Sequence, residues 1–201
     1  MSARELFWVV PLGFAVALGA QAPPNIVQGL GPAGAYQTGG VDNVNLMNGG
    51  LNLTIPHKAA AHALCARHGP AAARTGMVNT MRREADGRWA GENSDGIGFV
   101  SAARAHGLLR SALPVAIFGS GGAGTAIAFA RAEAGVLRLD LFDTESARVD
   151  HLLQPFSRAF PALDAGSRPD SLRGAGLAVN ATPLGLHAGD PMPFDPARLD
   201  T

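Results

Sequence analysis

VAIFGSGGAGTAIAFARAEAGVLRLDLF, residues 115–142, decides the fold of this chain. Val115 and Ile117 belong to a β-branched run that predicts a strand, and a glycine-rich turn stops it. An alanine-rich segment then predicts a helix that closes with Gly135, and the alternating residues from Leu137 to Phe142 predict a second strand. This is the pattern of one βαβ unit, so we expect an α/β protein with a parallel sheet.

The glycines of the turn follow the spacing of a dinucleotide-binding loop. Gly119, Gly121 and Gly124 fit G-x-G-x-x-G, in which the glycines allow a tight turn, close approach to a pyrophosphate and close helix packing. Asp143 ends the second strand 19 residues after Gly124, near the distance of about 20 expected for an acid that holds the ribose diol. The pattern predicts an NAD(P) site; the alternative is a turn that merely packs a helix on a sheet.

The composition favours small-molecule chemistry. The 201 residues suffice for one large domain or two small ones. Sixteen basic residues balance sixteen acidic ones, so we expect neither nucleic acid nor an acidic membrane as a partner. The single Cys65 excludes an internal disulfide and a cysteine metal cluster, which fits a cytoplasmic location. His57 and His62 are five residues apart with no accompanying carboxylate, so we expect no metal site.

The N-terminal segment contains an apolar run from Leu6 to Ala20, followed by a small-x-small sequence typical of a signal cleavage site. The run is too short for a membrane span, and MSARE carries no net positive charge. We therefore favour a cytoplasmic protein, with a buried strand or a disordered start, over an exported one. Residues 28–50 are rich in Gly, Asn and Pro and predict a loop.

Lys58 stands where a strand meets a helix. Leu51 to Ile55 alternate and predict a short strand that Pro56 ends, and residues 57–69 predict a helix. At the first turn of that helix the dipole disfavours the charged form of a lysine, which suits proton transfer. The alternative is an ordinary surface lysine.

A second group of polar residues follows along the chain. Residues 75–83 predict a strand that carries Asn79, and Asp86-Gly87 predict a turn into another short strand. Asp95 then precedes a helix predicted over 97–105, where an N-cap is the commonest local role for an aspartate. Because Thr54, Lys58, Asn79 and Asp95 each lie at the end of a short element, we expect them to converge on one pocket.

Five sequence blocks resemble a known family in their order and separation: GLNLTIPHK (50–58), GMVNT (76–80), GENSDGIGF (91–99), FGSGGAGTA (118–126) and VNATPLG (179–185). Together they are similar to the signature of the shikimate dehydrogenase family, including its quinate/shikimate branch. The resemblance extends from Gly50 to about Leu199.

The resemblance implies roles for individual residues. Lys58 and Asp95 match the catalytic pair and also contact substrate, and Asn52, Thr54 and Asn79 match positions that line the substrate pocket. The implied cofactor-binding residues are Gly119, Ser120, Gly121, Gly122, Ala123, Gly124, Asp143, Asn180, Ala181 and Thr182.

The implied reaction is the reversible NAD(P)-dependent reduction of 3-dehydroshikimate to shikimate, in aromatic amino acid biosynthesis. Quinate oxidation is the alternative within the enzyme class, and a catalytically impaired nucleotide-binding remnant is the alternative outside it. Asp143, together with the lack of an Asn-Arg-Thr turn, favours NAD over NADP.

The sequence also departs from the family. Ser94 replaces the usual Thr, and Pro183 stands where Ser is common. No Ser-x-Ser strand-loop is recognisable in residues 1–49, and the chain ends before the segment that supplies a substrate-contacting Gln. We expect two lobes preceded by an atypical segment: residues 1–49 loop-rich, 50–108 an incomplete substrate lobe with a linking helix, and 109–201 a truncated Rossmann-like lobe of marginal stability. A homodimer is left open.

Overall fold

A computed structural model describes residues 7–8, 35–37, 43–47, 50–54, 57–109, 114–168, 172–185 and 189–198, the first three ranges as backbone only. The chain divides into two compact units, a larger one of residues 1–20 and 96–201 and a smaller one of residues 21–95. The three-part division expected from the sequence stays a prediction.

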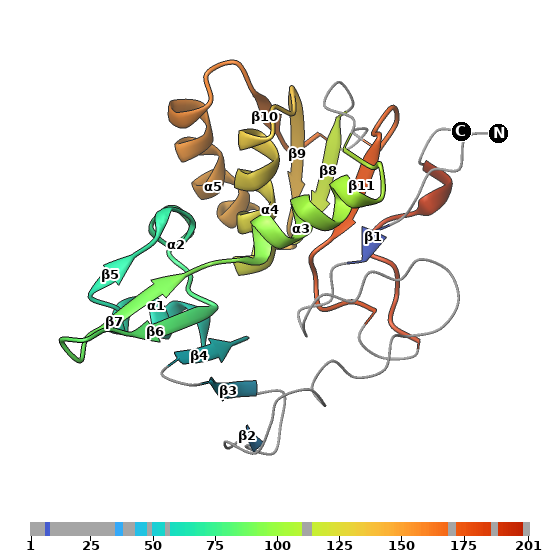
Figure 1. Cartoon of the computed structure of the whole chain (residues 1–201). Helices are drawn as coiled ribbons and strands as arrows, with labels where there is room; N and C mark the ends of the chain where they lie inside the picture. Colours follow the sequence, from blue (N-terminus) through green and yellow to red (C-terminus); the bar gives the residue numbers. More distant parts are fainter. Residues whose placement is uncertain are drawn as a thin grey trace. The chain divides into compact units, whose positions relative to one another are not determined.

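The larger unit contains a five-stranded parallel sheet in the order β1-β11-β8-β9-β10 (Figure 1). Its strands are β1 (Phe7–Trp8), β8 (Val115–Phe118), β9 (Arg138–Phe142), β10 (Asp164–Gly166) and β11 (Leu177–Asn180). Its helices are α3 (Asp95–Ala105), α4 (Gly122–Glu133) and α5 (Ser146–Ala159), and a 3-10 turn covers Pro196–Arg198.

The strand order identifies the kind of sheet. Helix α4 connects β8 to β9, and α5 connects β9 to β10, while β11 returns to the other side of β8. This is the 3-2-1-4 order of a doubly wound nucleotide-binding fold, with its topological switch point between β8 and β11. The α/β class with a parallel sheet is therefore confirmed.

The two faces of this sheet are packed differently. Alternate strand residues such as Ile117 and Leu141, both fully buried, face α3, α4 and α5 in one large cluster. Phe129 of α4 stacks on Phe156 of α5, with ring centroids 4.4 Å apart. The opposite face presents Phe118, which stacks on Phe194 at 4.5 Å. Continuous apolar strands are the mark of a parallel sheet covered on both faces.

Asp140 corrects one interpretation of the sequence. From the sequence we expect the acidic residues around the end of β9 (Asp140, Glu145 and Asp150), apart from Asp143, to lie on the solvated surface, but Asp140 is only 1 % exposed. Its carboxylate accepts hydrogen bonds from Arg138 Nε and Arg168 Nη1, each at 3.0 Å. A buried carboxylate requires such partners, and one of them lies 28 residues away.

The smaller unit, residues 21–95, contains a second sheet, in the order β2-β3-β4-β6-β7-β5. Its strands are β2 (Ala35–Gln37), β3 (Asn43–Met47), β4 (Gly50–Leu53), β5 (Arg67–His68), β6 (Thr80–Arg83) and β7 (Trp89–Glu92), and its helices are α1 (Lys58–Leu64) and α2 (Pro70–Thr75). All neighbours are antiparallel except β5 and β7. Ala61, Cys65, Ala72, Val78 and Met81 form its core.

Several element boundaries differ from expectation. The loop predicted over 28–50 is wrong where β2 and β3 pair. The polar sequence of residues 162–173, with its Gly and Pro, also predicts a loop, but it contains β10. Residues 75–83 form a strand only from Thr80, because α2 extends to Thr75.

The helix predicted over 57–69 ends at Leu64. Cys65 is extended, and the amides of Ala66 and Gly69 bond to Trp89 and Gly91. These hydrogen bonds to β7 replace helical ones, so tertiary pairing overrides the helical pattern.

Of the apolar run from Leu6 to Ala20, the structure describes only the backbone of Phe7–Trp8, which pairs in parallel with β11. The rest of this run, together with the small-x-small sequence that follows it, lies outside the described residues. Every helix within the described ranges falls short of the length and apolar character that a bilayer crossing requires.

Candidate functional site

Lys58 and Asp95 form an ion pair in the smaller unit. Lys58 is the first residue of α1, and Asp95 is the first residue of α3. Lys58 Nζ lies 2.5 Å from Asp95 Oδ2, with the two side chains 10 % and 14 % exposed. Because both groups are largely withdrawn from water, their mutual attraction is screened less than that of a surface pair. The arrangement holds a cationic proton donor at a fixed place.

Asn79 completes this group. Its Nδ2 donates to Asp95 Oδ1 at 2.7 Å, while its Oδ1 accepts from the Ser94 amide at 3.0 Å. Its backbone bridges two strands, because Leu53 N donates to Asn79 O and Asn79 N donates to Glu92 O. Asn79 is therefore held from both sides, and it fixes the second oxygen of Asp95.

Asn52 joins the group through Thr80. Thr80 Oγ1 lies 3.1 Å from Asn79 Oδ1 and 3.2 Å from Asn52 Oδ1, and Asn52 faces Thr80 across the ladder of β4 and β6. The structure thus brings together four of the five residues predicted to contact substrate. Thr54, the fifth, follows β4, and its carbonyl accepts from His57 N at 2.9 Å.

Asn93 takes the capping position that the sequence offered to Asp95. Asn93 Oδ1 accepts from the Asp95 amide at 3.1 Å, and Asn93 is 2 % exposed. The carboxylate of Asp95 instead bonds to Lys58 and Asn79. A side-chain oxygen on a first-turn amide is what an N-cap supplies. Asp95 is thereby left to make contacts away from its own helix.

The glycine loop lies between β8 and α4. Gly119 has φ +96°, and a Cβ there would lie 2.7 Å from Ala181 O. A Cβ on Gly124 would lie 1.8 Å from Gly119 O, so the third glycine packs the helix against the turn. Gly121 has φ −68°, and a Cβ on it would meet nothing within 4 Å. Only the first and third glycines are thus required by the fold.

The free space at Gly121 suits a dinucleotide. Helix α4 begins after Gly121 with no side-chain cap and no acidic residue in its first turn, among the described residues. Its first amides, including those of Gly122 and Ala123, therefore remain available to an anion. The residues present fit the pyrophosphate of NAD(P).

Asp143 is tied to the same loop. Its Oδ2 accepts from the Ser120 amide at 2.8 Å and from the Ser120 hydroxyl at 2.7 Å. Burial alone would raise the pKa of Asp143, but these hydrogen bonds, a third from Glu145 N and the charge of Arg148 hold it below its ordinary value. The group is therefore a carboxylate that organises the turn.

The loop after β11 packs against the glycine turn. Ala181 N donates to Phe118 O at 2.7 Å, and the Ala181 carbonyl lies over Gly119. Asn180 is 2 % exposed, and its side chain bonds to Thr182 and to Leu184 O. Asn180 thus shapes this loop from within, whereas Ala181 lies against the predicted phosphate loop.

Three residues of the Lys58 group, Thr80, Asn93 and Ser94, were not named as site residues from sequence; Thr80 links Asn79 to Asn52. Asn93 and Ser94 fix Asp95 and Asn79 respectively. The signal for Asn93 was its place two residues before a helix start, where a side-chain oxygen caps well. Ser94 donates to Asn79 Oδ1 through both its amide, at 3.0 Å, and its hydroxyl, at 3.3 Å, so its signal was a polar side chain directly before Asp95.

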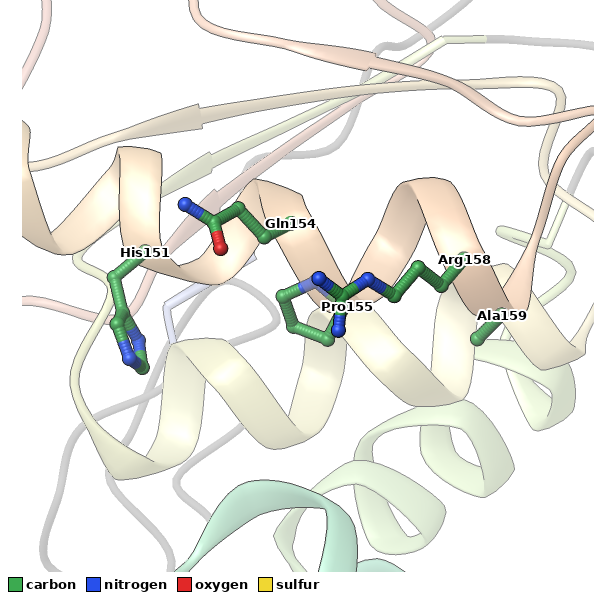
Figure 2. Close-up of a pocket in the computed structure, with 5 residues that line it drawn as sticks. All are labelled: His151, Gln154, Pro155, Arg158 and Ala159. Atoms are coloured by element: carbon green, nitrogen blue, oxygen red, sulfur yellow. The ribbon is translucent and has the colours of Figure 1, made fainter.

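One cavity lies elsewhere, along α5. It has a volume of about 490 Å³, and His151, Gln154, Pro155, Arg158 and Ala159 line it, all on one face of the helix (Figure 2). None of the predicted site residues lines it. Among the described residues, no group of three His, Cys, Asp or Glu is placed to hold a metal ion.

No family model matches the chain, but curated proteins are similar to it in sequence. Shikimate dehydrogenase (NADP(+)) from Acidiphilium cryptum is 39 % identical over 149 residues, which cover 74 % of this chain and 52 % of that protein. The one from Rubrobacter xylanophilus is 37 % identical over 151 residues, which cover 72 % and 52 %. The chain spans about half the length of these curated relatives.

Solved structures give a concordant result. Shikimate 5-dehydrogenase from Thermus thermophilus, in complex with NADP(H) and shikimate, has a TM-score of 0.59 at 38 % identity, covering 69 % of this chain and 49 % of that one. Quinate dehydrogenase from Corynebacterium glutamicum, in complex with NAD, has a TM-score of 0.63 at 32 % identity, covering 75 % and 55 %. The resemblance read from the sequence blocks is confirmed.

Proposed function

We propose that this chain, a homologue of the shikimate dehydrogenases, catalyses the reversible NAD(P)-dependent reduction of 3-dehydroshikimate to shikimate. The observation that carries the proposal is the largely buried pair of Lys58 and Asp95 with Asn79 on its second oxygen. A cationic donor held in this way suits the reduction of a ketone, in which negative charge develops on the carbonyl oxygen.

Each residue of the group has a part in the proposed reaction. NAD(P)H, when bound, supplies the hydride. Lys58 Nζ stabilises the developing alkoxide and gives it a proton; in the reverse direction it takes the proton back. Asp95 holds the ammonium and Asn79 holds Asp95, so the donor is oriented before the substrate arrives. Asn52 and Thr54 would contact the hydroxyl groups of the substrate.

We assign the cofactor to the glycine loop, with NAD preferred over NADP. The amides that open α4 would bind the pyrophosphate, and the Asp143 carboxylate would accept the two ribose hydroxyls. A 2′-phosphate next to that carboxylate would be repelled. The curated relatives are named for NADP, but the preference proposed here follows from the residue at this turn.

Quinate is the second candidate substrate. The similarity to a quinate dehydrogenase in complex with NAD favours it, because that protein is paired with the nucleotide that Asp143 suits. We place the reaction in the cytoplasm, since a nicotinamide cofactor and a single unpaired cysteine both suit a reducing compartment.

The test is an absorbance assay of the purified chain with shikimate or quinate and either nucleotide. The proposal expects reduced nicotinamide to accumulate with one of these acids and not without it. The matched control is Lys58→Ala, which should abolish the acid-dependent signal. If the parent chain binds a dinucleotide but oxidises neither acid, the nucleotide-binding remnant becomes the better description.

A further inference from the structure

Arg148, in the first turn of α5, forms an ion pair with Glu145, which lies in the turn between β9 and α5. Glu145 precedes α5, and its amide donates to Asp143 Oδ1 at 3.1 Å, which fixes its place beside the expected ribose position. Its carboxylate does not cap α5. Instead, Arg148 Nε donates to Oε2 at 2.9 Å and Arg148 Nη2 donates to Oε1 at 2.7 Å.

This pairing bears on the 2′-phosphate, the one group that distinguishes NADP from NAD. Arginine is the side chain that best recognises a phosphate, because its planar fork donates two hydrogen bonds at once. In this turn the fork already binds both oxygens of Glu145. A 2′-phosphate here would meet two carboxylates, Asp143 and Glu145, and one cation whose Nε and Nη2 already donate to Glu145.

We propose that Glu145 is a second determinant of cofactor choice, which disfavours NADP by engaging Arg148 and by repelling the 2′-phosphate. The inference rests on the proposed function, since it presupposes that the ribose lies at Asp143. NAD carries no charge on the 2′ oxygen and is indifferent to Glu145. It follows that replacing Asp143 alone does not change the cofactor preference of the chain from NAD to NADP, because Glu145 still binds Arg148.

The competing view is that the pair merely supports the helix. Glu145 and Arg148 are 61 % and 56 % exposed and three residues apart, and such surface pairs contribute little to stability. A helix-supporting pair would affect both nucleotides equally, through the fold. A specificity determinant affects NADP alone. Because this exposed ion pair contributes little to stability, removing it should leave the variants folded and able to be tested.

The experiment measures the dissociation constants of NAD and NADP directly, without substrate, by calorimetric titration. Glu145→Gln keeps the length of the side chain and removes its charge. We expect NADP to bind about tenfold more tightly than in the parent, the gain of one charge-assisted contact, and NAD to change less than about twofold. The gain should shrink at high salt, because the turn is exposed.

Glu145→Gln/Arg148→Gln is the matched control. If the freed arginine causes the gain, the double variant loses most of it; a gain that persists in full there would overturn the role of Arg148. If the parent binds NAD and Glu145→Gln leaves NADP affinity unchanged, the inference is overturned and the proposed function stands. If no variant binds either dinucleotide, the proposed function fails and this inference with it.

Discussion

Lys58 Nζ and Asp95 Oδ2 lie 2.5 Å apart although 37 residues separate them in the chain. The contact joins the first residues of two helices, and each side chain is largely buried. A lysine and an aspartate that served only solubility would be more exposed than these. The pair therefore carries the first prediction.

Lys58→Ala should lower turnover by about 10²–10⁴-fold, the usual contribution of positioned proton transfer. Lys58→Arg should restore little activity, because a guanidinium keeps its proton at neutral pH. Turnover per folded molecule is the measurement, with NAD affinity as the control that should hardly change. Parental turnover in Lys58→Ala would remove the proposed proton donor.

Asp95 and Asn93 should separate catalysis from helix capping. Asn93→Ala removes the oxygen that accepts the Asp95 amide and should cost about 0.5–2 kcal/mol of unfolding free energy. Asp95→Asn keeps the size of the side chain but removes the partner charge of Lys58, so turnover should fall more than stability explains. Denaturant melts and rate assays on both variants provide the comparison. Equal loss per folded molecule in the two would contradict this division.

Gly121 and Gly124 should respond in opposite ways to alanine. A methyl group on Gly124 would lie 1.8 Å from Gly119 O and should destabilise the fold, whereas one on Gly121 meets nothing within 4 Å. Gly121→Ala should therefore melt like the parent yet bind NAD more weakly, on the order of tenfold for one lost charge-assisted contact. Thermal melts with and without NAD test this. Unchanged NAD affinity in a folded Gly121→Ala would argue against pyrophosphate binding at this turn.

Asp143 should contribute to stability in a manner that depends on pH. Its pKa is held below the ordinary value in the folded chain, so its contribution is fully present above the unfolded pKa of about 3.9 and is lost as pH falls through the folded pKa. The stability difference between the parent and Asp143→Asn should accordingly be larger at pH 7 than at acid pH. Urea melts at several pH values measure it; a difference that is independent of pH would refute the assignment.

Arg131→Met should stabilise the chain by about 1–3 kcal/mol, the cost of a buried donor without a partner. Arg131 lies in α4, is 1 % exposed, and its Nε has no hydrogen-bond partner among the described residues. Burial lowers the pKa of this guanidinium, which reflects the cost of keeping its charge away from water. Methionine removes that cost at similar length. Arg131→Lys, which keeps a charge, is the control and should bring no gain in melting temperature.

The βαβ unit was predictable because its signals are local. Strand, glycine turn and helix succeed one another within 28 residues, and the positive φ of Gly119 and Gly135 requires the residue type that the sequence supplies. By contrast, the early end of α1 depends on pairing with β7, and the burial of Asp140 depends on a distant arginine. Neither partner is visible in a local pattern.

The candidate site was predictable to a similar degree. Local reading favoured a cap for Asp95, whereas the order of the short elements predicted that it converges with Lys58, and the resemblance to a family made the two a catalytic pair. The contact that decides against capping is made by Asn93, whose preference for that position was present in the sequence but competed with two neighbouring polar residues. Which of several adjacent polar residues caps a helix is decided by packing, not by type.

The buried Asp140 has a consequence for association between chains. Strand β10 is the last strand on its side of the sheet that the structure describes, and an edge strand can be a template for the strand of another molecule. Arg168, held by Asp140 and Asp164, lies over Gly166 at the end of this strand. A three-residue edge crossed by a charged side chain is a poor partner for a foreign strand, so the ion pair that anchors β10 also protects the sheet against aggregation.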